Sequence, residues 1–392
     1  MKKIKDWPLV VKVLIAIVLG VIVGQFVPGW VVRVGNTFTG IFDQLLRFFI
    51  PLIIVGLVTP AIADVGHKAG RMLLITVALA YGFTVCSGLF AYLFSAGIFP
   101  SLVSEGSMAA LEEAGKDFPA FFTIGIPPLM DVMTALVLSF LLGLGIAFSN
   151  ADILMRGFAE LRVIIVRSIE KVIIPFLPYY IFGLFMDMAA AGKVAPVLGS
   201  FIVMVAVIFV MTLVLLVLQY CVAGAVVRRN PFKLLGKMLP AYMTALGTAS
   251  SAATIPVTLK SAVSNGVSPG VAGFTIPLCA TIHLSGSTLK ITSCAIALML
   301  MLDIPFDFGT IFGFILMLGV TMVAAPGVPG GAIMAALGVL GSILGFDPTQ
   351  QALMITLYIA MDSFGTACNV TGDGAIALIV DKIASKDAAV AE

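Results

Sequence analysis

Four polar residues share one face of an apolar segment near the end of the chain, residues 352–380. Asp362, Thr366, Asn369 and Asp373 lie at i, i+4, i+7 and i+11. If the segment is one helix, a turn of about 100° per residue places them within roughly 40° of one another. A carboxylate inside a bilayer is costly unless it faces a bundle interior or a water-filled path. We interpret the stripe as a binding surface for a cation and a polar solute. The alternatives are an aspartate bonded to nearby backbone and an Asp373 close to the membrane surface.

The composition indicates a helical membrane protein with several spans. Of 392 residues, 60% are hydrophobic and 11% are charged, whereas about a quarter are charged in a soluble domain. The net charge of +2 and the lack of basic runs give no sign of nucleic-acid binding. The five cysteines lie in apolar stretches without metal-ligand spacing, which is typical of small buried thiols.

The first 227 residues read as ordinary membrane-spanning helices, each of which needs about 20 apolar residues. The candidate spans are residues 9–27, 39–63, 72–99, 133–148, 163–190 and 194–227. We interpret the first as a true span rather than a cleaved signal, because no clear cleavage site follows it. The clusters of lysine and arginine fall in alternate connections between these spans, so that all the clusters would lie on one side, the cytoplasm. This pattern predicts cytoplasmic termini and an external loop at 101–117.

The later segments are interrupted. Residues 239–259, 274–302 and 308–346 are apolar but are broken by serines, glycines or prolines. Irregular backbone at membrane depth is tolerated where it lines a cavity, and paired broken segments mark the binding site of a transporter. Ser250 and Ser251 would offer hydroxyls and free N–H groups to a carboxylate, or simply allow close helix packing. Residues 327–331 would offer carbonyls to a cation or form a gate, or only a proline kink.

Groups that enzymes use are scarce in this chain. The only histidines are His67 and His283, and no glycine-rich phosphate loop follows a strand. No arginine follows Arg229, so the broken segments hold no guanidinium for a second carboxylate. An intramembrane enzyme is therefore a weaker hypothesis than a carrier, and the repeated broken segments have no catalytic rationale either. A channel is a third alternative.

Four motifs resemble those of the dicarboxylate/amino acid:cation symporter family, the glutamate-transporter homologues. They are TASSAATIPVT (248–258), PLCATIHLSGST (277–288), GVPGGAIM (327–334) and MDSFGTACNVTGD (361–373). The resemblance implies a homotrimer of all-α subunits, each with eight transmembrane helices and two re-entrant hairpins. It also implies inverted repeats and an elevator mechanism in the cell membrane.

The same resemblance implies a division of the chain into two functional parts. Residues 1–71 and 128–192 would form a fixed scaffold of helices 1, 2, 4 and 5. Residues 72–100 and 193–384 would form the moving transport domain, namely helix 3, helix 6, hairpin 1, helix 7, hairpin 2 and helix 8. An extracellular loop (101–127) and a cytoplasmic tail (385–392) complete the chain.

The resemblance also assigns roles to particular residues. Asp362 matches the aspartate that holds the substrate amino group, Ser251 and Asn369 match groups that bind the α-carboxylate, and Thr366 matches a wall residue. The substrate set further includes Ser250, Gly365, Gly327 and Val328. For sodium, the resemblance implies Asp373 with carbonyls of Cys279, His283 and Asn369, and a second site with carbonyls of Thr281, Val323 and Ala325.

Several positions depart from the family pattern. Gly365 stands where members with acidic substrates carry arginine, and Ala249 stands where some members carry another. Ser285 replaces an aspartate that binds a third sodium ion. Its expected partners on helix 3, namely Val77, Ala80 and Tyr81, suit sodium poorly, so we expect that site to be lost.

We expect sodium-driven uptake of a small neutral α-amino acid, because Gly365 removes a cation and leaves space. The alternative is a proton-coupled or exchanging amino acid or dicarboxylate carrier. His283 and Lys290, seven residues apart, are candidates for a proton site or a tethered cation. Their simpler interpretations are a local hydrogen bond for His283 and a side chain of Lys290 that extends to the membrane interface. No organic cofactor is expected.

Overall fold

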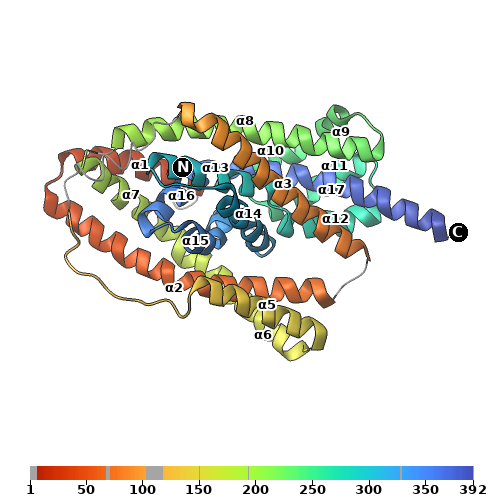
Figure 1. The fold of residues 1–392 in the computed structure, drawn as a ribbon, viewed down its shortest axis with the longest axis horizontal. Helices are drawn as coiled ribbons and strands as arrows, with labels where there is room; N and C mark the ends of the chain where they lie inside the picture. Colours follow the sequence, from red (N-terminus) through yellow and green to blue (C-terminus); the bar gives the residue numbers. More distant parts are fainter. Residues whose placement is uncertain are drawn as a thin grey trace.

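The structure, a computed structural model, describes residues 7–67, 71–102, 118–149, 151–192, 194–326 and 329–391, and every regular element in these ranges is a helix (Figure 1). In chain order they are α1 (Leu9–Phe26), α2 (Gly29–His67), α3 (Arg71–Leu102), α5 (Val132–Ser149), α6 (Asp152–Ser168), the π-helical turn η2 (Ile169–Ile173), α7 (Ile174–Ala190), α8 (Val194–Val227), α9 (Pro231–Lys237), α10 (Leu239–Thr248), α11 (Ser251–Ser264), α12 (Pro269–Ile282), α13 (Ser285–Met301), α14 (Phe308–Val323), α15 (Gly331–Leu344), α16 (Pro348–Ala360) and α17 (Asp362–Ala391). The predicted fold class, an all-α membrane protein, is confirmed at this level.

Six helical stretches in the described residues are long and apolar enough to cross a membrane. They correspond to α1, α2, α3, the continuous run from α6 to α7, α8, and the run from α12 to α13. The bent pair α16–α17 would make a seventh, and α5, α14 and α15 are shorter apolar helices. The expected number of eight spans with two re-entrant hairpins therefore stays a prediction.

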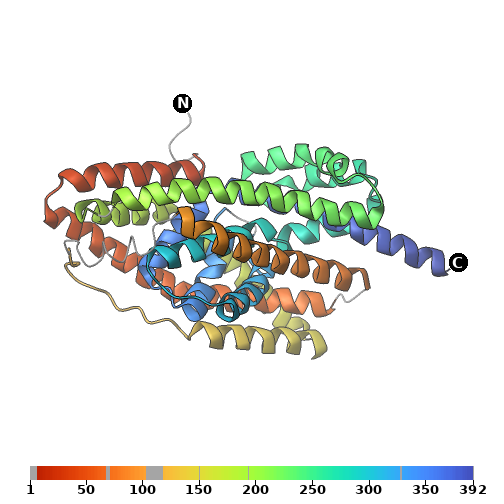
Figure 2. The same ribbon diagram turned by 45° about the horizontal axis from the view of Figure 1, so that its top comes forward.

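The helices pack in two groups. In one group, α1 packs against α7, and α2 packs against α5, α6 and α7. In the other, α17 packs against α8, α10, α12 and α13, while α13 also packs along α3. Figures 1 and 2 show α2 and α5 on the side of the molecule opposite α8. The proposed division into a scaffold and a moving domain follows the same grouping and stays a proposal.

Two of the predicted interruptions are single helix breaks. Between α10 and α11, Ala249 has a left-handed backbone (φ 49°), which ends α10. The Ser250 hydroxyl then accepts a hydrogen bond from the Ala253 N–H (3.3 Å) and caps α11. Between α12 and α13, His283 and Leu284 have non-helical backbones.

The third interruption lies between α14 and α15. The chain leaves α14 after Val323 and re-enters a helix at Gly331, and Gly330 has φ 75°, a conformation that favours glycine. The predicted substrate contacts Gly327 and Val328 lie outside the described residues.

The prediction of one continuous helix over residues 352–380 is wrong at Met361, where α16 and α17 meet at 64°. The Met361 N–H bonds to the carbonyl of Tyr358 (3.1 Å) rather than four residues back. The Met361 carbonyl is also contacted by the Lys290 ammonium (3.2 Å). The polar stripe survives because all four of its residues lie on α17.

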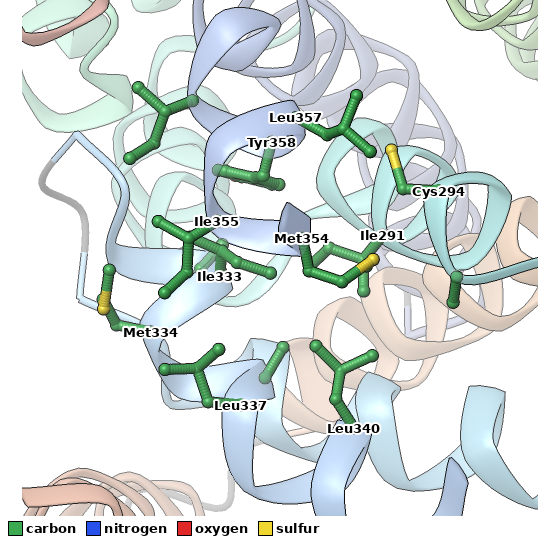
Figure 3. Close-up of a cluster of buried hydrophobic side chains, with 14 of the residues drawn as sticks. Ile291, Cys294, Ile333, Met334, Leu337, Leu340, Met354, Ile355, Leu357 and Tyr358 are labelled. Carbon is green, nitrogen blue, oxygen red and sulfur yellow. The ribbon is translucent and has the colours of Figure 1, made fainter. Parts of the chain in front are cut away.

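An apolar core holds the broken helices against one another. Figure 3 shows side chains of α13, α15 and α16 packed together, among them Ile291, Leu337 and Met354, which are all buried. Tyr358 lies on the α16 side of the same cluster. Close packing of this kind leaves little room for side chains to move, so it positions the last turn of α16 beside α13.

Candidate functional site

The four stripe residues are buried. Asp362, Thr366, Asn369 and Asp373 expose 4%, 6%, 2% and 1% of their surfaces. Two carboxylates in such a place need compensating partners. The partners divide the stripe into a group around Asp362, a group around Asn369 and a group around Asp373.

Asp362 begins α17 and joins two other elements. One carboxylate oxygen, Oδ2, accepts a hydrogen bond from the Gly330 N–H at the start of α15 (2.8 Å). The other, Oδ1, lies 3.7 Å from the Lys290 ammonium on α13. The carboxylate expected to hold the substrate amino group therefore contacts both the α14–α15 connection and an internal cation.

Lys290 does not extend to a membrane interface, because its side chain is fully buried. Its Nζ lies 3.8 Å from the centre of the Tyr358 ring and 3.2 Å from the Met361 carbonyl. A Cβ added at Gly365 would lie 2.2 Å from Lys290 Cε and 2.3 Å from its Nζ. The expectation that Gly365 leaves free space without a cation is wrong, since the lysine fills that space with one.

Asn369 ties α17 to the first turn of α13. Its Oδ1 accepts hydrogen bonds from the N–H groups of Gly286 (2.8 Å) and Ser287 (3.3 Å), and its Nδ2 donates to the Ser287 hydroxyl (3.2 Å). The Ser287 hydroxyl also bonds to the Tyr358 hydroxyl (2.8 Å). Ser287 and Tyr358 did not figure in the sequence prediction. Their hydroxyl groups gave little signal, because α13 and α16 each carry other polar side chains.

The approach of α13 to α17 depends on Gly286. A Cβ there would lie 2.6 Å from the Gly365 carbonyl oxygen and 2.6 Å from Cys368 Cβ. We expect Gly286→Ala to lower the stability of the protein by about 1–3 kcal/mol, because the backbone of one helix must shift. Thermal unfolding in detergent measures this effect. Gly273→Ala on α12 is the matched control, since a Cβ there meets nothing within 4 Å. Equal stability of the two variants would contradict the prediction.

Asp373 pairs with a histidine side chain. His283 Nδ1 lies 2.9 Å from Asp373 Oδ1, and both side chains are buried. The His283 ring also meets the Phe83 ring edge-on, with centroids 6.2 Å apart. The Cys279 carbonyl accepts the backbone N–H of His283 (2.8 Å). Asp373 on α17 therefore meets the α12–α13 break through the His283 imidazole, which the prediction had considered only as a local hydrogen-bond donor or a proton site.

The residues predicted for the second ion site lie near the ends of α12 and α14. Val323 packs against the buried cluster that contains Cys279 and Ile282, and Ala325 is buried just beyond it. The Thr281 hydroxyl donates to the Leu278 carbonyl (2.8 Å). The described residues hold no group of three or more His, Cys, Asp or Glu side chains suited to a metal ion. An ion at the first site would therefore rely on Asp373 and backbone carbonyls, and an ion at the second site on backbone carbonyls. Both sites stay predictions.

Ser285 has partners that the sequence analysis did not anticipate. Its hydroxyl accepts from the Gln219 amide on α8 (3.0 Å), and its carbonyl accepts from the Ser87 hydroxyl on α3 (2.6 Å). Ser87 is thus the α3 residue that hydrogen-bonds to Ser285, whereas Val77, Ala80 and Tyr81 were the expected partners. The Tyr81 hydroxyl instead donates to the Leu316 carbonyl (3.1 Å). Gln219 is the one amide in the long apolar helix α8, which was the available signal.

Ser250 and Ser251 lie at the turn between α10 and α11, and both helices pack against α17. Ser251 is buried, and the Ser250 carbonyl accepts from the Thr254 hydroxyl (2.8 Å). The two helices that flank this turn therefore pack against the helix that carries the stripe. Contact of these serines with a substrate carboxylate stays a prediction.

The chain is similar to known transporters over nearly its whole length. A profile of the sodium:dicarboxylate symporter family matches residues 9–383. The serine/threonine transporter SstT of Acinetobacter baumannii strain AYE is 28% identical over 386 residues, 95% of this chain and 96% of the relative. The same transporter from strain SDF is 30% identical over 387 residues, with the same coverage.

Proposed function

The chain belongs to the sodium:dicarboxylate symporter family, and on that premise we propose that it takes up a small neutral α-amino acid by sodium-driven symport. Serine, threonine, alanine and cysteine are the candidate substrates. Family membership also makes the chain a multi-pass membrane transporter rather than an enzyme.

The observation that carries this proposal is the buried carboxylate of Asp362 between two breaks in the helices. It lies at the bend between α16 and α17, and its oxygen accepts the Gly330 N–H beside the α14–α15 break. A carboxylate in a low-dielectric site favours an ammonium partner. The similar transporters named for serine and threonine support the substrate size.

Sodium is proposed as the coupling ion, and its ligands as Asp373 with the carbonyls named above. Hard cations favour carboxylate and carbonyl oxygens. The remaining proposals are a homotrimer in the cell membrane with cytoplasmic termini, and an elevator motion of α3 and α8–α17 against α1, α2 and α5–α7. The packing of the helices in these same two groups supports the motion.

A dicarboxylate or acidic amino acid is the second candidate substrate. The Lys290 ammonium lies in the space beside Gly365, where relatives with acidic substrates carry arginine. If it left Asp362, it could meet a second carboxylate, although a single ammonium grips a carboxylate less specifically than a guanidinium does.

Competition during uptake tests the substrate class. In proteoliposomes with an inward sodium gradient, we expect excess unlabelled serine, threonine or alanine to suppress uptake of labelled serine, and aspartate to have little effect. The reason is that the broken segments hold no guanidinium to pair with a second carboxylate through two hydrogen bonds. Strong competition by aspartate, with none by serine or alanine, would contradict the proposal and favour the second candidate. Liposomes without the protein give the background.

Gly365→Arg alone is a poor test of acidic specificity, because the end of the Lys290 side chain occupies the space that the new side chain would enter. The informative variant combines Gly365→Arg with Lys290→Met. We expect that pair of changes to raise competition by aspartate relative to serine, since an arginine then occupies the space that Lys290 filled.

A further inference from the structure

A cation of the protein itself lies at the position proposed for the substrate ammonium. Among the side chains that the structure describes, Lys290 is the one lysine or arginine that is fully buried. Burying an ammonium is strongly unfavourable unless a counter-charge and hydrogen bonds compensate it. Its neighbours are Asp362 Oδ1, the Met361 carbonyl and the face of Tyr358. Within the described ranges, Asp362 is the carboxylate with which it forms an ion pair.

The two oxygens of Asp362 are already used. Oδ2 accepts the Gly330 N–H at 2.8 Å, and Oδ1 faces Lys290. A substrate ammonium that approaches Asp362 would therefore meet the lysine ammonium at Oδ1. Two ammonium groups on one side of a carboxylate repel each other in a low-dielectric site, so one excludes the other.

Lys290 makes one directed hydrogen bond, to the Met361 carbonyl (3.2 Å), and its other contacts are non-directional. The Nζ–Oδ1 distance of 3.7 Å is longer than a hydrogen bond, so charge rather than a directed bond joins the pair. The contact with the Tyr358 ring contributes a second, non-directional attraction (3.8 Å). The absence of a side chain at Gly365 makes room for the end of the lysine. A flexible four-carbon stem allows the ammonium to leave without moving the backbone.

We propose that Lys290 is an internal occupant of the substrate-ammonium position, and that it sets how strongly the carrier requires an amino group on its substrate. The inference rests on the proposed function and identifies a residue that determines its specificity. While Lys290 neutralises Asp362, a ligand that has a carboxylate but no amino group can bind without leaving the charge of Asp362 unpaired. An amino acid must displace the lysine, and its own ammonium then replaces the one removed.

The test compares two ligands that differ only at this group, alanine and lactate. Their dissociation constants are measured on the full-length protein in detergent at fixed sodium concentration and pH, for the wild type and for Lys290→Met. In the variant, lactate leaves Asp362 unpaired while alanine pairs with it. We expect the preference for alanine over lactate to rise on the order of a hundredfold in the variant.

Two further variants make the test specific. Gly365→Ala retains both charges but places a Cβ where the end of the lysine lies, so we expect a rise in the same direction and of smaller size. Gly365→Ala also provides the test of the lysine's role if Lys290→Met does not fold. Lys260→Met removes an exposed lysine from α11 and should leave the preference unchanged.

The outcomes separate the inference from the proposed function. An unchanged alanine-to-lactate preference in folded Lys290→Met and Gly365→Ala would overturn the role of the lysine and leave the amino-acid carrier standing. Wild-type protein that binds lactate but not alanine, together with a gain of alanine binding in Lys290→Met, would support the lysine's role and overturn the amino-acid substrate.

Discussion

Asp362→Asn is expected to abolish amino-acid binding, with a loss of on the order of a hundredfold or more in affinity. An asparagine carbonyl can still accept the Gly330 N–H, but it offers no charge to the substrate ammonium. The loss should appear in equilibrium binding of labelled serine to purified protein. Asp303→Asn, at an exposed position after α13, is the control and should bind as the wild type does.

The single variant also leaves Lys290 without its counter-charge, which is expected to lower stability by about 3–5 kcal/mol. A double variant, Asp362→Asn with Lys290→Met, removes both charges and should recover much of the thermal stability in detergent. It should not recover binding. Wild-type affinity in the double variant would show that the carboxylate serves the ion pair with Lys290 and does not hold the substrate.

Asp373→Asn is expected to flatten the dependence of substrate affinity on sodium. In the wild type, affinity should rise with sodium when ionic strength and pH are held constant with an inert cation. The asparagine oxygen can still accept a hydrogen bond from His283 Nδ1, which lies 2.9 Å from the carboxylate. The substitution therefore removes a charge from the proposed cage while it preserves the local packing. Asp303→Asn again provides the control, with its sodium dependence intact.

A different ion would give a different pattern. Wild-type binding and uptake that ignore sodium but follow an imposed proton gradient would overturn sodium coupling. That result would point to His283 or Lys290, the two buried nitrogen bases beside the carboxylates. Proteoliposomes loaded with sodium-free buffer, with and without a proton gradient, make the comparison directly.

Several features followed from local sequence alone. Because 60% of the residues are hydrophobic, the chain is expected to lie in a membrane. Helices satisfy the backbone hydrogen-bonding groups there, since lipid offers them no partners. The serines near residue 250 and the glycines and prolines of 326–331 interrupt apolar runs, and the described helices end at both places. The four-residue stripe from Asp362 to Asp373 lies on one helix because its spacing matches the helical period.

The bend at Met361 had no such local signal, since neither glycine nor proline stands there. It coincides with contacts from elsewhere in the fold, above all from Lys290 on α13, 71 residues away along the chain. The roles of Ser87, Gln219, Ser287 and Tyr358 also depend on which helix lies opposite.

The sequence by itself therefore determined the class of protein, three of the places where its helices break (near residues 250, 283 and 326–331) and the face on which its carboxylates lie. These properties depend on composition and on the period of a helix, which act over a few neighbouring residues. Tertiary structure alone decided that Asp362 meets Lys290 and that Asp373 meets His283. Helical periodicity predicts which face of a helix is polar. Only packing brings a distant helix to that face, and so decides which side chain lies opposite each carboxylate.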